Sequence, residues 1–157
     1  GRFEALRSED GKTAIVDYAH TPDALNNVIS TINEIRKDGQ QLLTVCGCGG
    51  NRDKTKRPQM AKEAVVGSDI VILTSDNPRN EDPMDILSDM KAGLNGEESA
   101  LVLTIPDRRE AIFTAVKMAK SGDIILVAGK GHEDYQEING IKHHFDDREE
   151  VMRMFNK

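Results

Sequence analysis

The chain has 157 residues, of which 38% are hydrophobic and 31% are charged, and its formal net charge at pH 7 is −6. This length is sufficient for one domain with a substantial hydrophobic core, and no apolar run approaches the length of a membrane span. The negative charge and the absence of tryptophan argue against a protein that binds the phosphate backbone or stacks on the bases of a nucleic acid.

The predicted elements begin with a β-hairpin. Residues 2–6 and 12–17 are strand-like, and the Asp10-Gly11 pair between them favours a tight turn. A helix follows, with Thr21 as its expected N-cap and its end near Asp38-Gly39. The apolar residues of this helix recur at helical spacing, so one face is expected to pack on the core.

The rest of the chain alternates strands with helices. Four apolar runs predict buried strands, at residues 41–46, 69–75, 100–104 and 123–128. Helical spacing predicts helices over residues 58–66 and 83–94, a third that begins at Asp107, and a last one that starts near Asp146. The Asn139-Gly140 pair favours a second hairpin that leads into residues 141–145, an expected edge strand.

Strands that alternate with helices on short connections are typical of a parallel sheet with right-handed crossovers. We therefore predict one α/β domain over residues 1–157. Its core is a Rossmann-like, mostly parallel sheet of about six strands, with one antiparallel edge strand and flanking helices. Cys46 and Cys48 lie too close together to indicate a disulfide framework, so we expect a reduced, cytoplasmic protein. Since the chain opens without methionine, the sequence is compatible with a fragment of a larger protein.

The segment Asp76-Asn77-Pro78-Arg79 stands where the third main strand must end, because proline cannot donate to a sheet ladder. Ligands of open α/β sheets bind beyond the carboxyl ends of the strands. A carboxylate, an amide and a guanidinium at this position are therefore candidates for a polar binding site. An Asx-Pro pair also starts ordinary turns, and that alternative remains open from this segment alone.

Polar residues follow three other strands as well, and a parallel sheet brings all of these segments to one edge. After the first long strand come Asp17, Tyr18 and His20; after the second, Arg52, Lys54, Lys56 and Arg57; after the last, Gly129, Lys130, His132 and Glu133. The glycine-rich loop at residues 47–54 fits neither a Walker A loop nor the Rossmann fingerprint. Its cations could hold a carboxylate or phosphate, or could form a solvated basic loop.

Three individual side chains have plain structural alternatives. His20 at a helix start could serve backbone groups only, and Glu133 could be an exposed loop carboxylate. His143 and His144 interrupt an apolar pattern and are interpreted as a surface feature of an edge strand rather than as metal ligands. We predict no metal site in this chain.

Five ordered segments together resemble the carboxy-terminal domain of the Mur ligases. They are Gly1-Arg-Phe-Glu4, residues 17–23, residues 47–58, Asp76-Asn-Pro-Arg79 and residues 129–136. The resemblance covers essentially the whole chain. Within the family the chain is most similar to the members that add meso-diaminopimelate during peptidoglycan precursor synthesis, because lysine-adding members usually depart from Asp-Asn-Pro-Arg.

The resemblance implies a cytoplasmic, three-domain ligase that uses ATP and Mg²⁺. An N-terminal domain holds the UDP-MurNAc-dipeptide, and a central domain carries the ATP-binding loop and the Mg²⁺ ligands. The third domain, which this chain resembles, presents the amino acid. ATP phosphorylates the D-glutamate side chain, and the amine of the amino acid attacks the acyl phosphate. The expected partners are these substrates and the two other domains, without nucleic acid or membrane, and the isolated domain is expected to be inactive.

The resemblance also implies roles for individual residues. Arg2 matches a catalytic arginine that reaches the ATP phosphates, and Asp17 and His20 match the nucleotide-facing loop. The segment Asp76-Asn77-Pro78-Arg79 and Arg52 match the part of the family's site that takes the distal carboxylate of diaminopimelate. Within this part, Arg52, Asn77 and Arg79 match the groups that hold the carboxylate. Gly129, by its carbonyl, and Glu133 match the group that holds the distal ammonium. The alternatives are a lysine-adding ligase, a folylpolyglutamate synthetase-like domain, and a non-catalytic amino-acid-binding module.

Overall fold

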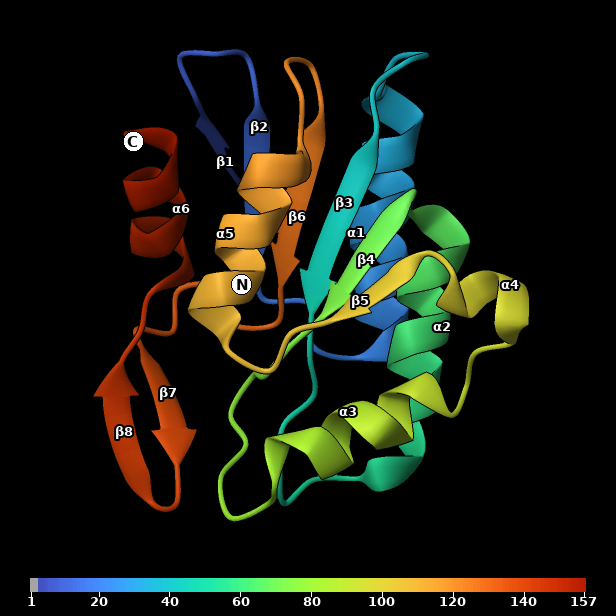
Figure 1. The fold of residues 1–157 in the computed structure, drawn as a ribbon, viewed down its shortest axis with the longest axis vertical. Helices are drawn as coiled ribbons and strands as arrows, with labels where there is room; N and C mark the ends of the chain where they lie inside the picture. The colour runs from blue at the N-terminus through green and yellow to red at the C-terminus, as the bar shows by residue number, and fades with distance from the viewer. Residues whose placement is uncertain (1–2) are drawn as a thin grey trace.

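The computed structural model describes residues 3–157 and contains a six-stranded sheet in the order β1-β2-β6-β3-β4-β5 (Figure 1). The strands are β1 (Glu4–Arg7), β2 (Thr13–Asp17), β3 (Leu42–Cys46), β4 (Ile70–Leu73), β5 (Val102–Thr104) and β6 (Ile124–Ala128). All neighbours run parallel except β1 and β2, which pair antiparallel at one edge. The predicted fold class and the first hairpin are confirmed.

Helices cover both faces of this sheet. They are α1 (Pro22–Ile35), α2 (Arg57–Gly67), α3 (Pro83–Lys91), α4 (Gly96–Ser99), α5 (Arg108–Met118) and α6 (Asp147–Phe155), with a 3-10 turn, η1 (Lys54–Lys56). In Figure 1, α1 and α2 lie behind the sheet, and α5 and α6 lie in front of it. Alternate residues of the central strands enter two separate apolar clusters, so β3, β4 and β6 are buried on both faces, as parallel strands are.

Short polar residues begin the helices where the sequence predicts. The Thr21 hydroxyl accepts from the amide of Ala24 at 3.2 Å, and Pro22 occupies the first helical position of α1. Asp107 and Asp146 cap α5 and α6 in the same way. These caps fix the start of each helix directly after a strand-end loop, and the strand-end loops are where the candidate site residues lie.

The second hairpin forms, but not as an edge of the main sheet. β7 (Tyr135–Ile138) and β8 (Ile141–His144) make a separate two-stranded sheet, so the prediction of an edge strand over 141–145 is wrong. All four residues of β8 are exposed, and a strand without an apolar face has nothing to bury against the core. His143 and His144 are exposed, as interpreted from the sequence. Helix α4 was not predicted; its signal is the capping box of Asn95 and Glu98.

In the part of the chain from residue 3 onward, no helix combines the length and the apolar character that crossing a membrane requires.

Candidate functional site

A cleft of about 320 Å³ opens beyond the carboxyl ends of β2, β3, β4 and β6. Its lining includes His20, Arg52, Asp76, Asn77, Arg79, Gly129 and Glu133. These residues come from four loops that are distant in sequence. The parallel topology brings them together, as the sequence predicts.

Two of the residues to which the resemblance assigns a role, Asp17 and Pro78, do not line this cleft. Arg2 lies outside the described residues. The Asp17 carboxylate accepts from the amide of Ala19 at 2.9 Å and so shapes the turn that carries His20. Pro78 is buried and contributes to the wall of a second cleft, on the side of the β7–β8 hairpin.

The loop after β4 is held in place by β7. The amide of Arg79 donates to the carbonyl of Glu137 at 2.9 Å, and the amide of Asn139 donates to the carbonyl of Arg79 at 2.8 Å. Arg79 has a φ of 53°, in the left-handed region that residues other than glycine rarely occupy. Two backbone hydrogen bonds therefore hold an unfavourable conformation that directs the Arg79 side chain into the cleft.

The glycine-rich loop packs directly against the loop after β4. The amide of Gly50 donates to the carbonyl of Asn77 at 2.7 Å, and the Arg79 guanidinium donates to the carbonyl of Gly50 at 2.9 Å. A Cβ atom at position 50 would overlap the carbonyl oxygen of Pro78. Glycine is required at position 50 because two backbones meet here.

A buried cation joins the same two loops from below. The Arg57 side chain is 1% exposed and donates to both carboxylate oxygens of Glu81, at 2.8 and 3.1 Å, and to the carbonyl of Gly49 at 3.2 Å. Glu81 also accepts from the amide of Asn51 at 2.5 Å. These hydrogen bonds lower the pKa of Glu81 from 4.5 to about 2, chiefly through Arg57.

We expect Glu81→Gln to destabilise the fold in a pH-dependent manner. The folded-state pKa lies below the unfolded-state pKa, so the stabilisation by the carboxylate is fully present above pH 4.5 and is lost as the pH falls towards 2. The difference in free energy of unfolding between wild type and Glu81→Gln should therefore shrink over that range. Urea unfolding at a series of pH values measures it, with Glu34→Gln on the exposed face of α1 as the control. A difference that stays constant down to pH 2.5 would contradict this assignment.

Side chains of both charges line the cleft. Arg52, Lys56 and Arg79 are the cations of its lining, and Asp53, Asp76 and Glu133 are its acidic side chains. Asp76 lies below them, and burial raises its pKa although Arg108 and Lys130 are near. Burial also raises the pKa of Cys48, which favours the neutral thiol in the wall of the cleft. A zwitterionic ligand with separated charges fits this arrangement.

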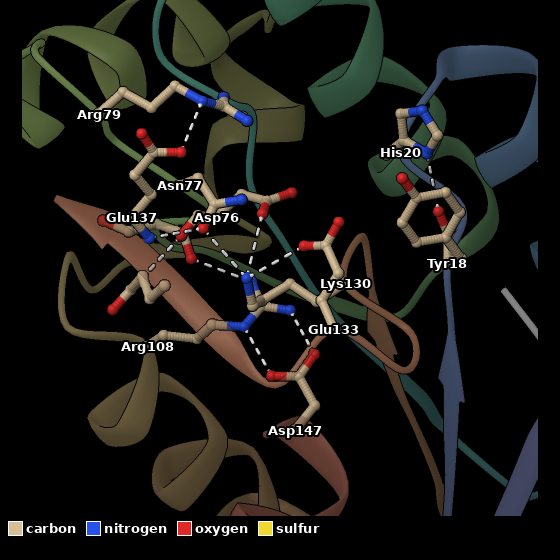
Figure 2. A network of polar contacts seen from close by, with 12 residues as sticks. Tyr18, His20, Asp76, Asn77, Arg79, Arg108, Lys130, Glu133, Glu137 and Asp147 are labelled. Carbon is tan, nitrogen blue, oxygen red and sulfur yellow. Dashed lines mark hydrogen bonds and ion pairs between the residues drawn. The ribbon is translucent and has the colours of Figure 1, made fainter. Parts of the chain in front are cut away.

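Two buried cations lie beneath the cleft, and the resemblance assigns a role to neither of them. Lys130 is fully buried, and its ammonium contacts Asn77 at 3.1 Å and Glu133 at 3.3 Å. Arg108 is fully buried against Asp147, and Figure 2 shows both cations among the labelled polar groups. The sequence places Lys130 after a strand, but charged side chains are expected at the surface, and only tertiary packing reveals their burial.

Comparisons with known proteins agree on one family. The family model "Mur ligase, glutamate ligase domain" matches residues 1–131. The UDP-N-acetylmuramoyl-L-alanyl-D-glutamate–2,6-diaminopimelate ligase of Bacteroides thetaiotaomicron is 60% identical over 156 residues, which are 99% of this chain and 32% of that protein. The chain thus spans about a third of the length of such relatives.

Solved structures give the same result. The structure of a UDP-N-acetylmuramoyl-L-alanyl-D-glutamate–2,6-diaminopimelate ligase superposes with a TM-score of 0.90 at 49% identity, over 99% of this chain and 31% of that chain. A folylpolyglutamate synthase of Mycobacterium tuberculosis, solved with ADP and AMPPCP, has a TM-score of 0.63 at 22% identity, over 82% of this chain and 29% of that chain. The second likeness establishes a shared fold alone.

Proposed function

The chain belongs to the Mur ligase family, and we propose that it is the C-terminal, amino-acid-presenting domain of a peptidoglycan-precursor ligase. The proposed enzyme consumes ATP to add meso-diaminopimelate to UDP-N-acetylmuramoyl-L-alanyl-D-glutamate through an acyl phosphate, in the cytoplasm. The relatives that carry this name match almost the entire chain, and they support the assignment. Because they are about three times as long, the N-terminal and central domains are part of the proposal.

The observation that carries the proposal is that cationic and acidic side chains from four loops line one cleft. Arg52, Asn77 and Arg79 would donate to the distal carboxylate of diaminopimelate. Glu133 and the carbonyl of Gly129 would accept from its distal ammonium. With its distal groups held in this way, the ligand keeps its other amine free to attack the acyl phosphate. The contribution of this chain is therefore binding and orientation.

The nucleotide and the metal belong mainly to the other domains in this proposal. Arg2, Asp17 and His20 would reach the nucleotide from this side, and His20 lies exposed at the rim of the cleft. Among residues 3–157, no group of three or more His, Cys, Asp or Glu side chains is arranged to hold a metal ion. The residues present thus fit part of an ATP site but not a Mg²⁺ site, and the Mg²⁺ ligands would come from the central domain. Bound ATP with Mg²⁺ supplies the phosphoryl group that activates the carboxylate.

The test is a comparison of amino acids in the full-length enzyme. With ATP, Mg²⁺ and the UDP-linked dipeptide, we expect meso-diaminopimelate to be used with a kcat/KM at least about 100-fold above that of lysine, since an arginine site left without its carboxylate is costly. Phosphate release and product formation measure the preference. The chain 1–157 alone should release no phosphate from ATP. Preferred turnover of lysine would assign the enzyme to the lysine-adding ligases instead.

A further inference from the structure

The amide of Asn77 has a defined orientation in this structure. Its oxygen, Oδ1, lies 3.1 Å from the ammonium of Lys130 and 2.9 Å from the backbone amide of Glu137. Both neighbours are donors only, so the oxygen must face them and the NH₂ group must point elsewhere. The NH₂ group makes no hydrogen bond with any of residues 3–157, and Asn77 lines the cleft. The asparagine therefore presents two N–H donors to a ligand.

The buried ammonium of Lys130 is the centre of this arrangement (Figure 2). It is fully buried, and besides Asn77 it contacts Oε1 of Glu133 at 3.3 Å and lies 3.8 Å from Oδ1 of Asp76. The ammonium thus donates to Asn77 and Glu133 and forms a longer ion pair with Asp76. The contact uses one carboxylate oxygen of Glu133 and leaves the other oxygen for a ligand.

We propose that Lys130 is a positioning residue that makes the site selective for an amino acid with a distal carboxylate. The proposal rests on the proposed function and deepens it. A rotated amide would direct its oxygen at the carboxylate of the ligand and its NH₂ group at the Lys130 ammonium, so two contacts would become repulsive. Together with the backbone amide of Glu137, Lys130 holds the Asn77 oxygen and so keeps the donors beside Arg79 in the cleft. Lys130 itself does not touch the ligand.

The orientation of the Asn77 amide should affect the use of diaminopimelate but not the use of lysine. Diaminopimelate has a distal carboxylate that would accept from Asn77, whereas lysine has only an ammonium at that end. Loss of the orientation should therefore reduce kcat/KM for diaminopimelate and leave the poor use of lysine almost unchanged. A general loss of structure would reduce both by the same factor. The ratio of the two kcat/KM values separates positioning from stability.

The experiment uses Lys130→Met in the full-length enzyme, because methionine is of similar length and carries neither charge nor donor. We expect KM for meso-diaminopimelate to rise about tenfold with kcat changed less than threefold, and selectivity over lysine to fall by about the same tenfold. Equal losses of kcat/KM for the two amino acids would overturn the proposal.

A second variant covers the case in which Lys130→Met does not fold. Asn77→Asp keeps an oxygen for Lys130 and for the amide of Glu137 but replaces the outward donor with an acceptor. Asn77→Asp should lose at least as much selectivity for diaminopimelate as Lys130→Met does. Adding Lys130→Met to Asn77→Asp should lower the selectivity little further, because both changes remove the same contact between the Asn77 amide and the ligand. Full selectivity in Asn77→Asp would refute the proposed orientation. If the wild-type enzyme prefers lysine, the proposed function fails as well. If the wild-type enzyme prefers diaminopimelate but the variants lose activity equally with both amino acids, only the role of Lys130 is refuted.

Discussion

Arg108→Met is expected to lower the free energy of unfolding by about 3–5 kcal/mol, the largest stability change that we predict for a single substitution in this chain. Arg108 and Asp147 form a bidentate ion pair, with N–O distances of 2.8 and 2.7 Å, and both side chains are fully buried. Removing the guanidinium leaves a carboxylate in the interior with no partner. The cost arises mainly from that unpaired charge.

Arg108 also holds two strand ends. Its guanidinium donates to the carbonyl of Ser75 at 3.0 Å and to the carbonyl of Ala128 at 3.1 Å. These residues directly precede Asp76 and Gly129, which line the candidate site. Loss of Arg108 therefore leaves two buried carbonyls without this donor, and it loosens two of the four loops that form the cleft.

Urea unfolding of the chain measures the prediction, and the neighbouring residue supplies the control. Arg109 is half exposed, and its partner Glu150 has a second cation, Arg153, at 3.0 Å. We expect Arg109→Ala to cost less than about 1 kcal/mol. The double variant Arg108→Met with Asp147→Leu should be more stable than Arg108→Met alone, because no buried charge is left unpaired. Similar losses for Arg108→Met and Arg109→Ala would refute the role assigned to the buried pair.

The burial of Arg108 illustrates how much could be predicted from the sequence. The apolar runs at β3, β4 and β6 and the caps at Thr21, Asp107 and Asp146 depend on local residue order, and the structure has them where the pattern indicates. Helical spacing places Arg108 on the same face of α5 as the buried residues Ala111, Ile112 and Ala115. The local sequence does not show that this arginine stays buried there, because its partners, Asp147 and the carbonyls of Ser75 and Ala128, come from distant parts of the chain.

The candidate site, like the fold, could be predicted only as far as local sequence and topology determine it. Topology alone brings His20, Arg52, Asn77 and Glu133 to one edge, since each follows a parallel strand. The bracing by β7 was missed, because Asn139-Gly140 predicts a hairpin but not where that hairpin docks. The family model ends at residue 131, so this hairpin lies outside the part that the family model describes. The roles of the individual site residues remain predictions.

The largest effect on catalysis is expected from Arg79→Ala, which should reduce kcat/KM for diaminopimelate by an amount equivalent to about 2–4 kcal/mol. The Arg79 side chain is 18% exposed, and its guanidinium is oriented by the carbonyl of Gly50 and by Glu137, whose carboxylate lies 3.5 Å away. Arg52 is more exposed and donates only to the carbonyl of Asn51 within the described part of the chain. Arg79 is therefore the better preorganised of the two arginines, and it should contribute more to holding a carboxylate.

The left-handed backbone conformation at position 79 should not be disturbed by this substitution. Alanine carries the same Cβ atom, so the left-handed conformation at φ 53° costs no more in Arg79→Ala than in wild type. The loss should thus appear in substrate use and only weakly in the urea midpoint. Arg79→Lys restores the charge without the planar fork and should recover only part of the activity. Lys54→Ala, which removes an exposed cation that does not line the cleft, should change kcat/KM less than about threefold. An Arg79→Ala enzyme with wild-type KM and kcat would show that this guanidinium does not hold the substrate, and selectivity would then have to arise from Arg52 and Asn77.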